Sequence, residues 1–314
     1  MLSKLSFNHL LSAKDVQKQD ILLLLDAAAS FHEGMASDVC QFCDLAKGKI
    51  LASLFFEAST RTRFSFESAM CRLGGAVLTL ENGASSSVKK GETLSDMGRI
   101  VSGYADIIVM RHPASNSVKE FSEYSQVPVI NAGDGPMEHP SQSLVDLYSI
   151  SYFQKKLDGL SIGFVGDLKF GRTVNSLVQL LAFFPHQQFY FISHPSLKIH
   201  PDKVKLLRDL GHRVVELSEF GDVVPELDVL YMTRVQAERF ESKALFDQVK
   251  DHFVLTEKSL LGCKPTLSIF HPLPRINEIS IEVDQHPAAR YFDQAKFGVY
   301  VRMAVLWHML GRAI

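Results

Sequence analysis

The segment Ser59–Thr62 carries residue types that suit the binding of a phosphate-like anion. It reads Ser-Thr-Arg-Thr and directly follows an apolar run, where a strand is expected to turn into a helix. Backbone amides, hydroxyl groups and a guanidinium meet at such a corner, and a helix N-terminus favours negative charge. Arg61 can bind two oxygens at once, and Arg111 is a second candidate clamp from a neighbouring loop. The same segment also fits ordinary helix capping, so both interpretations stay open.

Other candidate residues follow further apolar runs. Lys89 and Lys90 lie among small residues, so they are either a solvated charge run or part of a mobile loop that completes an active site. His139 precedes a proline and is either a satisfied core histidine or a functional one. The glycines of residues 163–171 do not have the G-x-G-x-x-G spacing, and no Walker motif is present, which argues against a nucleotide site.

Cysteine usage and the N-terminus favour a cytoplasmic protein without a metal site. Cys40 and Cys43 form a C-x-x-C pair, but no second Cys or His pair has matching spacing, so a structural role is expected rather than zinc. Four cysteines are too few for a disulfide scaffold in a chain of this length. We find no secretory signal and no apolar run long enough to span a bilayer.

Composition and charge limit the classes of function. The 314 residues are 46% hydrophobic and 22% charged, as in an ordinary globular protein, and the length favours two domains. The net charge of −2 does not favour nucleic acid or an anionic membrane as a partner. Any anion site must therefore be local.

The hydrophobic pattern predicts an α/β fold of two doubly wound domains, each with a central parallel β-sheet flanked by helices. A capping box at residues 12–15 predicts a first helix over 16–32. Alternating apolar runs and helical stretches indicate parallel sheets, with ligands at the carboxyl ends of the strands and the active site in the cleft between the domains. Strands are predicted at 50–56, 76–80, 107–110, 127–130, 162–165, 189–192, 214–216, 229–232 and 267–270, and longer helices at 140–156 and 295–310.

The loops of the second domain repeat the polar and cationic character of the first. They comprise residues 166–172, 233–236 and 271–275. All these loops would direct several cations at one cleft, with few acidic residues to neutralise them. Small polyanionic substrates are therefore expected.

Seven separated blocks resemble the aspartate and ornithine carbamoyltransferase family. Residues 55–63 are similar to the family's carbamoyl phosphate signature, and the likeness extends over nearly the whole chain. The other blocks are Lys89–Leu94, Met110–Pro113, Asn131–Gly135, His139–Gln142, Gly166–Thr173 and His271–Arg275. Within the family, Arg234 and Pro272 favour L-aspartate over ornithine, because Arg234 would repel a cationic side chain.

The resemblance implies a role for each matching residue. Carbamoyl phosphate would be bound by Ser59, Thr60, Arg61, Thr62, Arg111, His139, Gln142 and the backbone carbonyls of Pro272 and Leu273. Aspartate would be bound by Ser86, Lys90, Arg172, Arg234 and Gln236. The residues implied in catalysis are Arg61, Thr62, Lys90, Arg111 and His139.

The implied reaction is attack of the aspartate amine on carbamoyl phosphate, an early step of pyrimidine biosynthesis. Thr62, Arg111 and His139 would stabilise the oxyanion, with no metal or organic cofactor. The resemblance also implies residues 1–136, completed by a C-terminal helix at 292–314, as the carbamoyl phosphate domain, and residues 137–291 as the aspartate domain.

The family resemblance further implies a homotrimer, in which Ser86 and Lys90 come from an adjacent subunit. It leaves open whether a separate regulatory chain binds. Ser141, Lys296 and Phe297 depart from the commoner residues of the family and bear on local packing. The alternatives are a carbamoyltransferase for another amino acid and a non-catalytic scaffold homologue.

Overall fold

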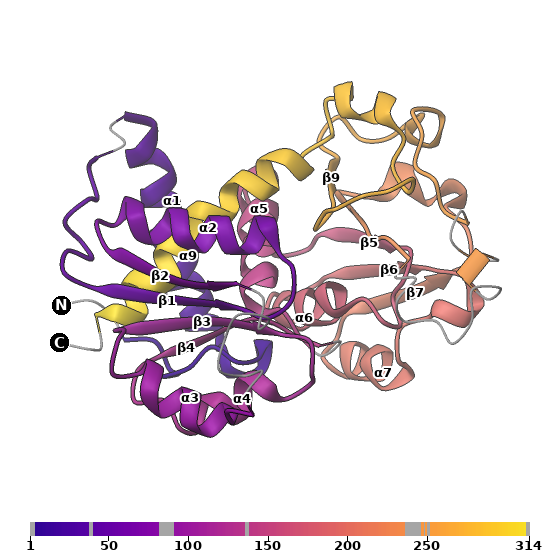
Figure 1. Ribbon diagram of the computed structural model, residues 1–314. Coiled ribbons are helices and arrows are strands. Elements are labelled where there is room, and N and C mark those ends of the chain that lie inside the picture. Colours follow the sequence, from indigo (N-terminus) through magenta and orange to yellow (C-terminus); the bar gives the residue numbers. More distant parts are fainter. Residues whose placement is uncertain are drawn as a thin grey trace. The chain divides into compact units, whose positions relative to one another are not determined.

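The computed structural model describes residues 4–37, 40–81, 91–135, 138–235, 246–247, 249 and 252–311. The chain divides into two compact units, one of Met1–Tyr148 with Lys296–Ile314 and one of Ser149–Ala295. Each unit contains one parallel β-sheet with flanking helices (Figure 1), which confirms the predicted fold class. Within the described ranges, no helix is long and apolar enough to cross a membrane.

The sheet of the first unit has the strand order β2-β1-β3-β4. All three pairings are parallel. The central strands are almost entirely buried, whereas β2 at the edge is half exposed, which matches the near-continuous apolar runs of β1 and β3. The strands are β1 (Ile50–Phe55), β2 (Ala76–Glu81), β3 (Ile107–His112) and β4 (Val129–Asp134).

Helices cover both faces of this sheet (Figure 1). Ala52 and Leu54 of β1 pack in one core cluster with Met97 of α3 (Leu94–Val101) and Phe121 of α4 (Ser117–Ser122). Ser53, on the opposite face of β1, donates a hydrogen bond of 2.9 Å to Glu67 of α2 (Thr60–Arg72). The period-two alternation of the strand therefore determines which helix each side chain meets.

Two local predictions in the first unit need correction. The capping box of Ser12 and Asp15 forms, but it opens only the 3-10 helix Ala13–Asp15, and α1 runs from Lys18 to Ser37 rather than over 16–32. Strands β3 and β4 also extend further than predicted, to His112 and Asp134. Arg111 therefore lies in a strand and not in a loop.

The sheet of the second unit has the order β7-β6-β5-β8-β9, again with parallel pairings. Helices α6 (Arg172–Leu181) and α7 (Pro201–Asp209) belong to this unit. The strands are β5 (Ser161–Val165), β6 (Gln188–Ile192), β7 (Arg213–Leu217), β8 (Val229–Met232) and β9 (Ser268–Phe270).

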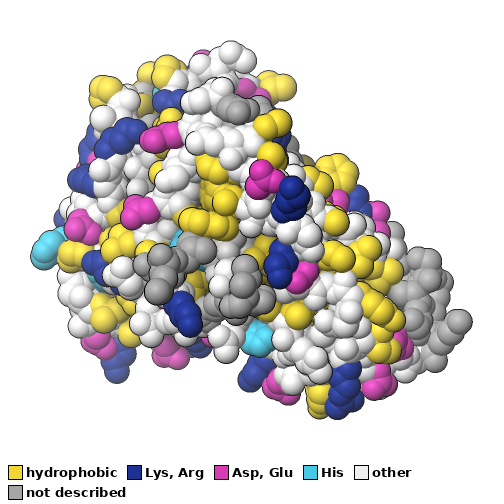
Figure 2. All heavy atoms as spheres, turned by 90° about the vertical axis from the view of Figure 1, so that its left-hand side faces the viewer, with side chains coloured by type: hydrophobic (Ala, Val, Ile, Leu, Met, Phe, Trp, Pro, Cys, Tyr) yellow, Lys and Arg dark blue, Asp and Glu magenta, His cyan; other side chains and the backbone are white. Residues whose placement is uncertain are grey.

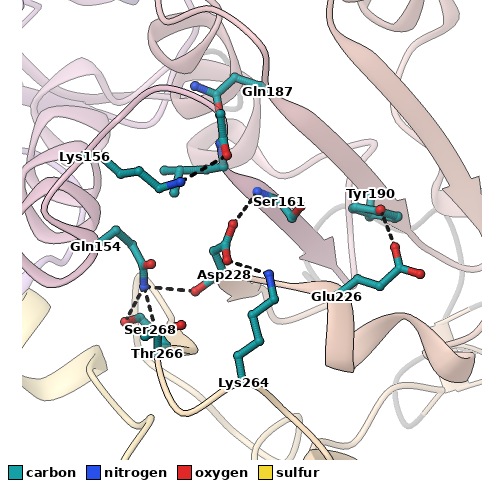
Figure 3. A network of polar contacts seen from close by, with 12 residues as sticks. Gln154, Lys156, Ser161, Gln187, Tyr190, Glu226, Asp228, Lys264, Thr266 and Ser268 are labelled. Carbon is teal, nitrogen blue, oxygen red and sulfur yellow. Dashed lines mark hydrogen bonds and ion pairs between the residues drawn. The ribbon is translucent and has the colours of Figure 1, made fainter.

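A polar network fastens the amino ends of the strands in the second unit (Figure 3). Asp228 accepts hydrogen bonds from the Ser161 amide at 2.9 Å and from Lys264 Nζ at 2.7 Å. Gln154 Nε2 donates to the Asp228 carbonyl and to the Ser268 hydroxyl. These contacts satisfy buried polar groups at the strand starts, so the polar side chains there have a structural role.

The first unit uses the same device at the amino ends of its strands. Asp106 accepts a hydrogen bond of 2.9 Å from the Ile50 amide and pairs with Lys49 Nζ at 3.1 Å. Polar residues at the amino ends of the strands thus have structural roles in both units. The predicted site residues that the structure describes lie at the opposite, carboxyl ends of the strands.

The long helices α5 (Pro140–Gln154) and α9 (Tyr291–Leu310) each contain residues of both units, because the units divide after Tyr148 and before Lys296. The part of α9 from Lys296 onward belongs to the first unit, where Arg302 is 3% exposed. On the face of the molecule drawn in Figure 2, cationic and anionic side chains are interspersed, in keeping with the net charge of −2.

Candidate active site

The amino end of α2 offers hydrogen-bond donors at the carboxyl edge of the first sheet. The helix begins at Thr60, directly after β1 and its short loop, and Ser59 is its N-cap residue. The Ser59 side chain makes no capping hydrogen bond. Since the first amides of a helix need an external acceptor, this end favours the anion-binding interpretation over ordinary side-chain capping.

Arg61 and Arg111 bring two guanidinium groups to this edge. Burial and the nearby charge of Arg111 both lower the pKa of Arg61 below its ordinary value. Arg111 is 9% exposed. A Cβ on Gly133, whose φ is +128°, would lie 3.2 Å from Arg111 Nη1, so glycine leaves room for this side chain. Two like charges in mutual repulsion constitute a site that an anion would stabilise.

Glu57 is an acidic residue at this site whose role the sequence analysis did not anticipate. Its Oε1 lies 3.2 Å from Arg111 Nη2. Its Oε2 is buried without a hydrogen-bond partner, as is Arg111 Nε. We expected few acidic residues near these cations. Glu57 is nevertheless present and supplies a counter-charge to the guanidinium group of Arg111.

Thr62 and His139 lie together although 77 residues separate them. Thr62 Oγ1 is 3.5 Å from His139 Nε2, and both residues are buried. Ser141 Oγ lies 3.3 Å from His139 Nδ1. Ser141, expected to bear only on local packing, thus contacts the candidate catalytic imidazole and can orient it.

Gln142 lies in the first turn of α5 and is only partly buried. Its Nε2 donates a hydrogen bond of 2.7 Å to Oδ1 of Asp146, one turn further along the same helix. Asp146 is fully buried. The predicted carbamoyl-binding residues of the first unit thus lie at its helix N-termini and strand ends.

In the second unit, three predicted segments follow adjacent strands. Arg172 begins α6 after β5, and Arg234 follows β8, which pairs with β5. Pro272 and Leu273 follow β9, which pairs with β8. Because the strands are parallel, all these residues lie at one edge of the sheet.

Thr233 links the loops after β5 and β8 through two hydrogen bonds of its hydroxyl group. Its hydroxyl accepts a hydrogen bond of 3.0 Å from the Asp167 amide and donates one of 3.1 Å to the Val165 carbonyl. Gly166 has φ +113°, and a Cβ there would lie 2.4 Å from the Thr233 carbonyl oxygen. Only glycine permits this approach, which fixes the loops that carry Arg172 and Arg234.

A buried histidine shapes the loop after β9. His271 Nδ1 accepts a hydrogen bond of 2.8 Å from the Leu273 amide, so the ring proton is on Nε2, which donates to Glu278 Oε1 at 2.7 Å. Desolvation lowers the pKa of His271 despite the opposing effect of Glu278. Leu273 has φ +54°, a conformation that non-glycine residues rarely adopt.

Glu278 supports the same loop from its other end. Its Oε2 accepts hydrogen bonds from the amides of Ile276 and Asn277 at 3.0 and 3.1 Å. Burial raises the pKa of Glu278, but the hydrogen bonds from His271 and the amides outweigh that effect and lower it overall. The backbone that carries the Pro272 and Leu273 carbonyls is thereby held in one shape.

Three predicted site residues, Ser86, Lys90 and Gln236, lie outside the described residues. Among the residues that the structure does describe, no group of three His, Cys, Asp or Glu side chains could hold a metal ion. The four cysteines are free.

Both units match known family models. Residues 8–152 match the "aspartate/ornithine carbamoyltransferase, carbamoyl-P binding domain". Residues 158–309 match the "aspartate/ornithine carbamoyltransferase, Asp/Orn binding domain". The chain belongs to the aspartate/ornithine carbamoyltransferase family. The resemblance of the seven sequence blocks is therefore confirmed at the level of the family.

Curated relatives in the family are named for aspartate rather than ornithine. The aspartate carbamoyltransferase catalytic subunit of Methanocaldococcus jannaschii is 47% identical over 95% of this chain and 96% of its own length. The subunit of the same name from Chromobacterium violaceum is 44% identical, over 98% and 99%.

Solved structures agree with this relationship. A crystal structure of the M. jannaschii catalytic subunit superimposes with a TM-score of 0.91 at 45% identity, covering 98% of this chain and 99% of the other. The Trypanosoma cruzi aspartate transcarbamoylase in complex with N-(phosphonacetyl)-L-aspartic acid gives 0.91 at 35%, covering 98% and 97%.

Proposed function

We propose that this protein is an enzyme that transfers the carbamoyl group of carbamoyl phosphate to L-aspartate and releases phosphate. The observation that carries the proposal is the group formed by Arg61, Arg111, Thr62 and His139 at one edge of the first sheet. Family membership and relatives named for this activity support the same reaction.

The first unit supplies the groups that carbamoyl phosphate needs. The amides of Ser59–Thr62 and the guanidinium of Arg61 bind the phosphoryl oxygens, and Arg111 reaches both phosphate and carbonyl oxygen. Arg111 leaves Glu57 to do so. Because phosphate carries more charge than one carboxylate, the exchange favours the substrate.

The chemical step is nucleophilic attack by the neutral amine of aspartate on the carbamoyl carbon. The carbonyl π electrons move onto oxygen, and Thr62, Arg111 and His139 stabilise that developing negative charge. The tetrahedral intermediate then collapses, and the bond between the carbamoyl carbon and the bridging phosphate oxygen breaks. The departing phosphate is a base and accepts the proton that the attacking nitrogen loses, which completes the transfer.

The second unit supplies the groups for aspartate. Arg172 and Arg234 lie at one sheet edge and suit two carboxylates, and Gln236 adds a further donor. The backbone carbonyls of Pro272 and Leu273 accept the hydrogens of the carbamoyl amino group, and the fixed His271–Glu278 loop orients them.

The assembly proposed is a homotrimer in which Ser86 and Lys90 complete the site of an adjacent subunit. The protein is placed in the cytoplasm, which the four free cysteines support. Mixing inactive Lys90→Ala and Arg61→Ala chains should restore part of the activity, and no recovery would count against shared sites.

The test of the reaction is a colorimetric assay for ureido product with carbamoyl phosphate and a panel of amino acids. We expect product with L-aspartate and none with L-ornithine, L-alanine or L-asparagine. Product with ornithine would refute L-aspartate as the specific substrate. The absence of product with every amino acid would refute carbamoyltransferase activity.

A further inference from the structure

A buried acid and a buried arginine stand behind Gln142, a residue that the proposed function places at the carbamoyl group. Asp146 is fully buried and Arg302 is 3% exposed. Burial lowers the pKa of Arg302 to about 10, and the negative charge of Asp146 opposes that shift. Because a buried charge is costly without an opposite charge nearby, we treat these two attracting residues as a pair in the core of the first unit.

The surroundings hold Arg302 in place. Its guanidinium carbon lies 5.0 Å from the ring centre of Phe66, on the helix that begins at Thr60. A Cβ on Gly298 would lie 2.3 Å from Arg302 Nη1, so the guanidinium occupies the space that a larger residue would fill. Helices α2, α5 and α9 thus each contribute to fixing the pair.

The pair also determines which way the Gln142 amide points. A carboxylate only accepts hydrogen bonds, so the group that faces Asp146 Oδ1 at 2.7 Å must be the Gln142 NH2. The Oε1 atom then points away from Asp146. Gln142 is partly exposed, whereas Asp146 is not, so this oxygen is the end of the amide that remains available to a ligand.

We infer that Asp146, supported by Arg302, is a positioning residue that orients Gln142 so that its carbonyl oxygen accepts a hydrogen bond from the carbamoyl amino group. The inference rests on the proposed function and adds to it a source of donor specificity. An acyl phosphate that carries a methyl group in place of the NH2 would gain nothing from this oxygen, because a methyl group cannot donate.

Two stable phosphonates test the orientation directly. Phosphonoacetamide carries the NH2 group, and acetonylphosphonate carries a methyl group in its place. The NH2 preference is the ratio of the dissociation constant of acetonylphosphonate to that of phosphonoacetamide, measured by calorimetry. A merely structural role of Asp146 would weaken both ligands together and leave this ratio unchanged.

The expected changes are graded. Gln142→Ala should lower the preference about tenfold, the size of one hydrogen bond between uncharged groups. Asp146→Leu combined with Arg302→Met removes both buried charges and should lower it by a similar factor. Asp146→Asn should lower it only about twofold, because asparagine can accept from or donate to Gln142 and half of the molecules keep the orientation.

Two comparisons decide the result. Adding Gln142→Ala to the Asp146→Leu/Arg302→Met variant should lower the preference no further. The matched control is Asp106→Leu with Lys49→Met, which removes an ion pair at the amino ends of the strands in the first sheet. This control should leave the NH2 preference at the wild-type value. If the Leu/Met variant does not fold, the twofold effect of Asp146→Asn is the deciding value.

The positioning role would be overturned if the Asp146 variants kept the full NH2 preference, or if they lost affinity for both ligands by the same factor. Either result would leave the proposed function intact. Failure of the wild-type protein to bind either phosphonate would instead overturn the proposed function itself. The two failures are therefore distinguishable.

Discussion

Replacing Glu278 by glutamine should destabilise the loop after β9 without changing its volume. Glu278 is 4% exposed and accepts three hydrogen bonds, one from His271 Nε2 and two from the amides of Ile276 and Asn277. Glutamine has one accepting atom in place of two. Its NH2 group must therefore face either the histidine N–H or the two amides, and donors then oppose donors.

The histidine cannot relieve this mismatch by changing tautomer. His271 Nδ1 accepts from the Leu273 amide at 2.8 Å, so the proton must stay on Nε2. One unsatisfied buried donor, together with the loss of charge-assisted bonds, corresponds to about 2–3 kcal/mol. That is a factor of roughly 30–150 in the local opening equilibrium.

Hydrogen exchange followed by mass spectrometry on a peptide spanning residues 271–280 measures this opening. The Leu273, Ile276 and Asn277 amides should exchange faster in Glu278→Gln by that factor, and turnover should fall because the Pro272 and Leu273 carbonyls lose their orientation. Glu257→Gln, at an exposed site, is the matched control and should leave exchange unchanged. Unchanged exchange in Glu278→Gln would refute the role of the His271–Glu278 pair.

Three further predictions concern the phosphate site, the pH dependence and the second unit. Arg61→Ala should lower turnover at least ~10²-fold while leaving the unfolding midpoint in urea near the wild-type value, and near-normal turnover would contradict a phosphate-binding role. The lowered pKa of His271 means that the unfolded chain takes up a proton near pH ~6.5 while the folded protein does not, so stability in urea should fall as pH drops below ~6.5. His271→Gln should flatten that dependence, and an equal slope would argue against this origin. Gly166→Ala should cost roughly 2 kcal/mol or more in urea unfolding, because its Cβ would meet the Thr233 carbonyl at 2.4 Å, and a neutral effect would show that the loop yields.

Local sequence patterns predicted most elements of both sheets. The nearly continuous apolar runs at 50–56 and 107–110 are typical of strands buried on both faces, and the strands that they predict, β1 and β3, are central in their sheet. Element boundaries were harder to predict, because Arg111 looks like a loop residue although neighbouring strands hold it in β3. Tertiary pairing, rather than the polarity of the side chain, decided that boundary.

The candidate site was predictable in its residue types and not in its contacts. The residue types of Ser59–Thr62 predict an anion-binding helix N-terminus, with ordinary helix capping as the alternative, because this chemistry depends on neighbouring residues alone. The approach of Thr62 to His139 depends on the strand order, which no periodicity specifies. The contact of Asp146 with Gln142 could have been predicted from their spacing of four residues on one helix, whereas the burial of Arg302 could not.

We propose that the predicted cations of both units bind one pair of substrates. A crystal structure of this protein with N-(phosphonacetyl)-L-aspartate tests it most directly, because that molecule joins analogues of the two reactants. We expect the phosphonate at Ser59–Thr62 and Arg111, the carbonyl oxygen within hydrogen-bond distance of His139, and the carboxylates at Arg172 and Arg234. A ligand bound elsewhere, or one whose phosphonate does not contact Arg61, would contradict it.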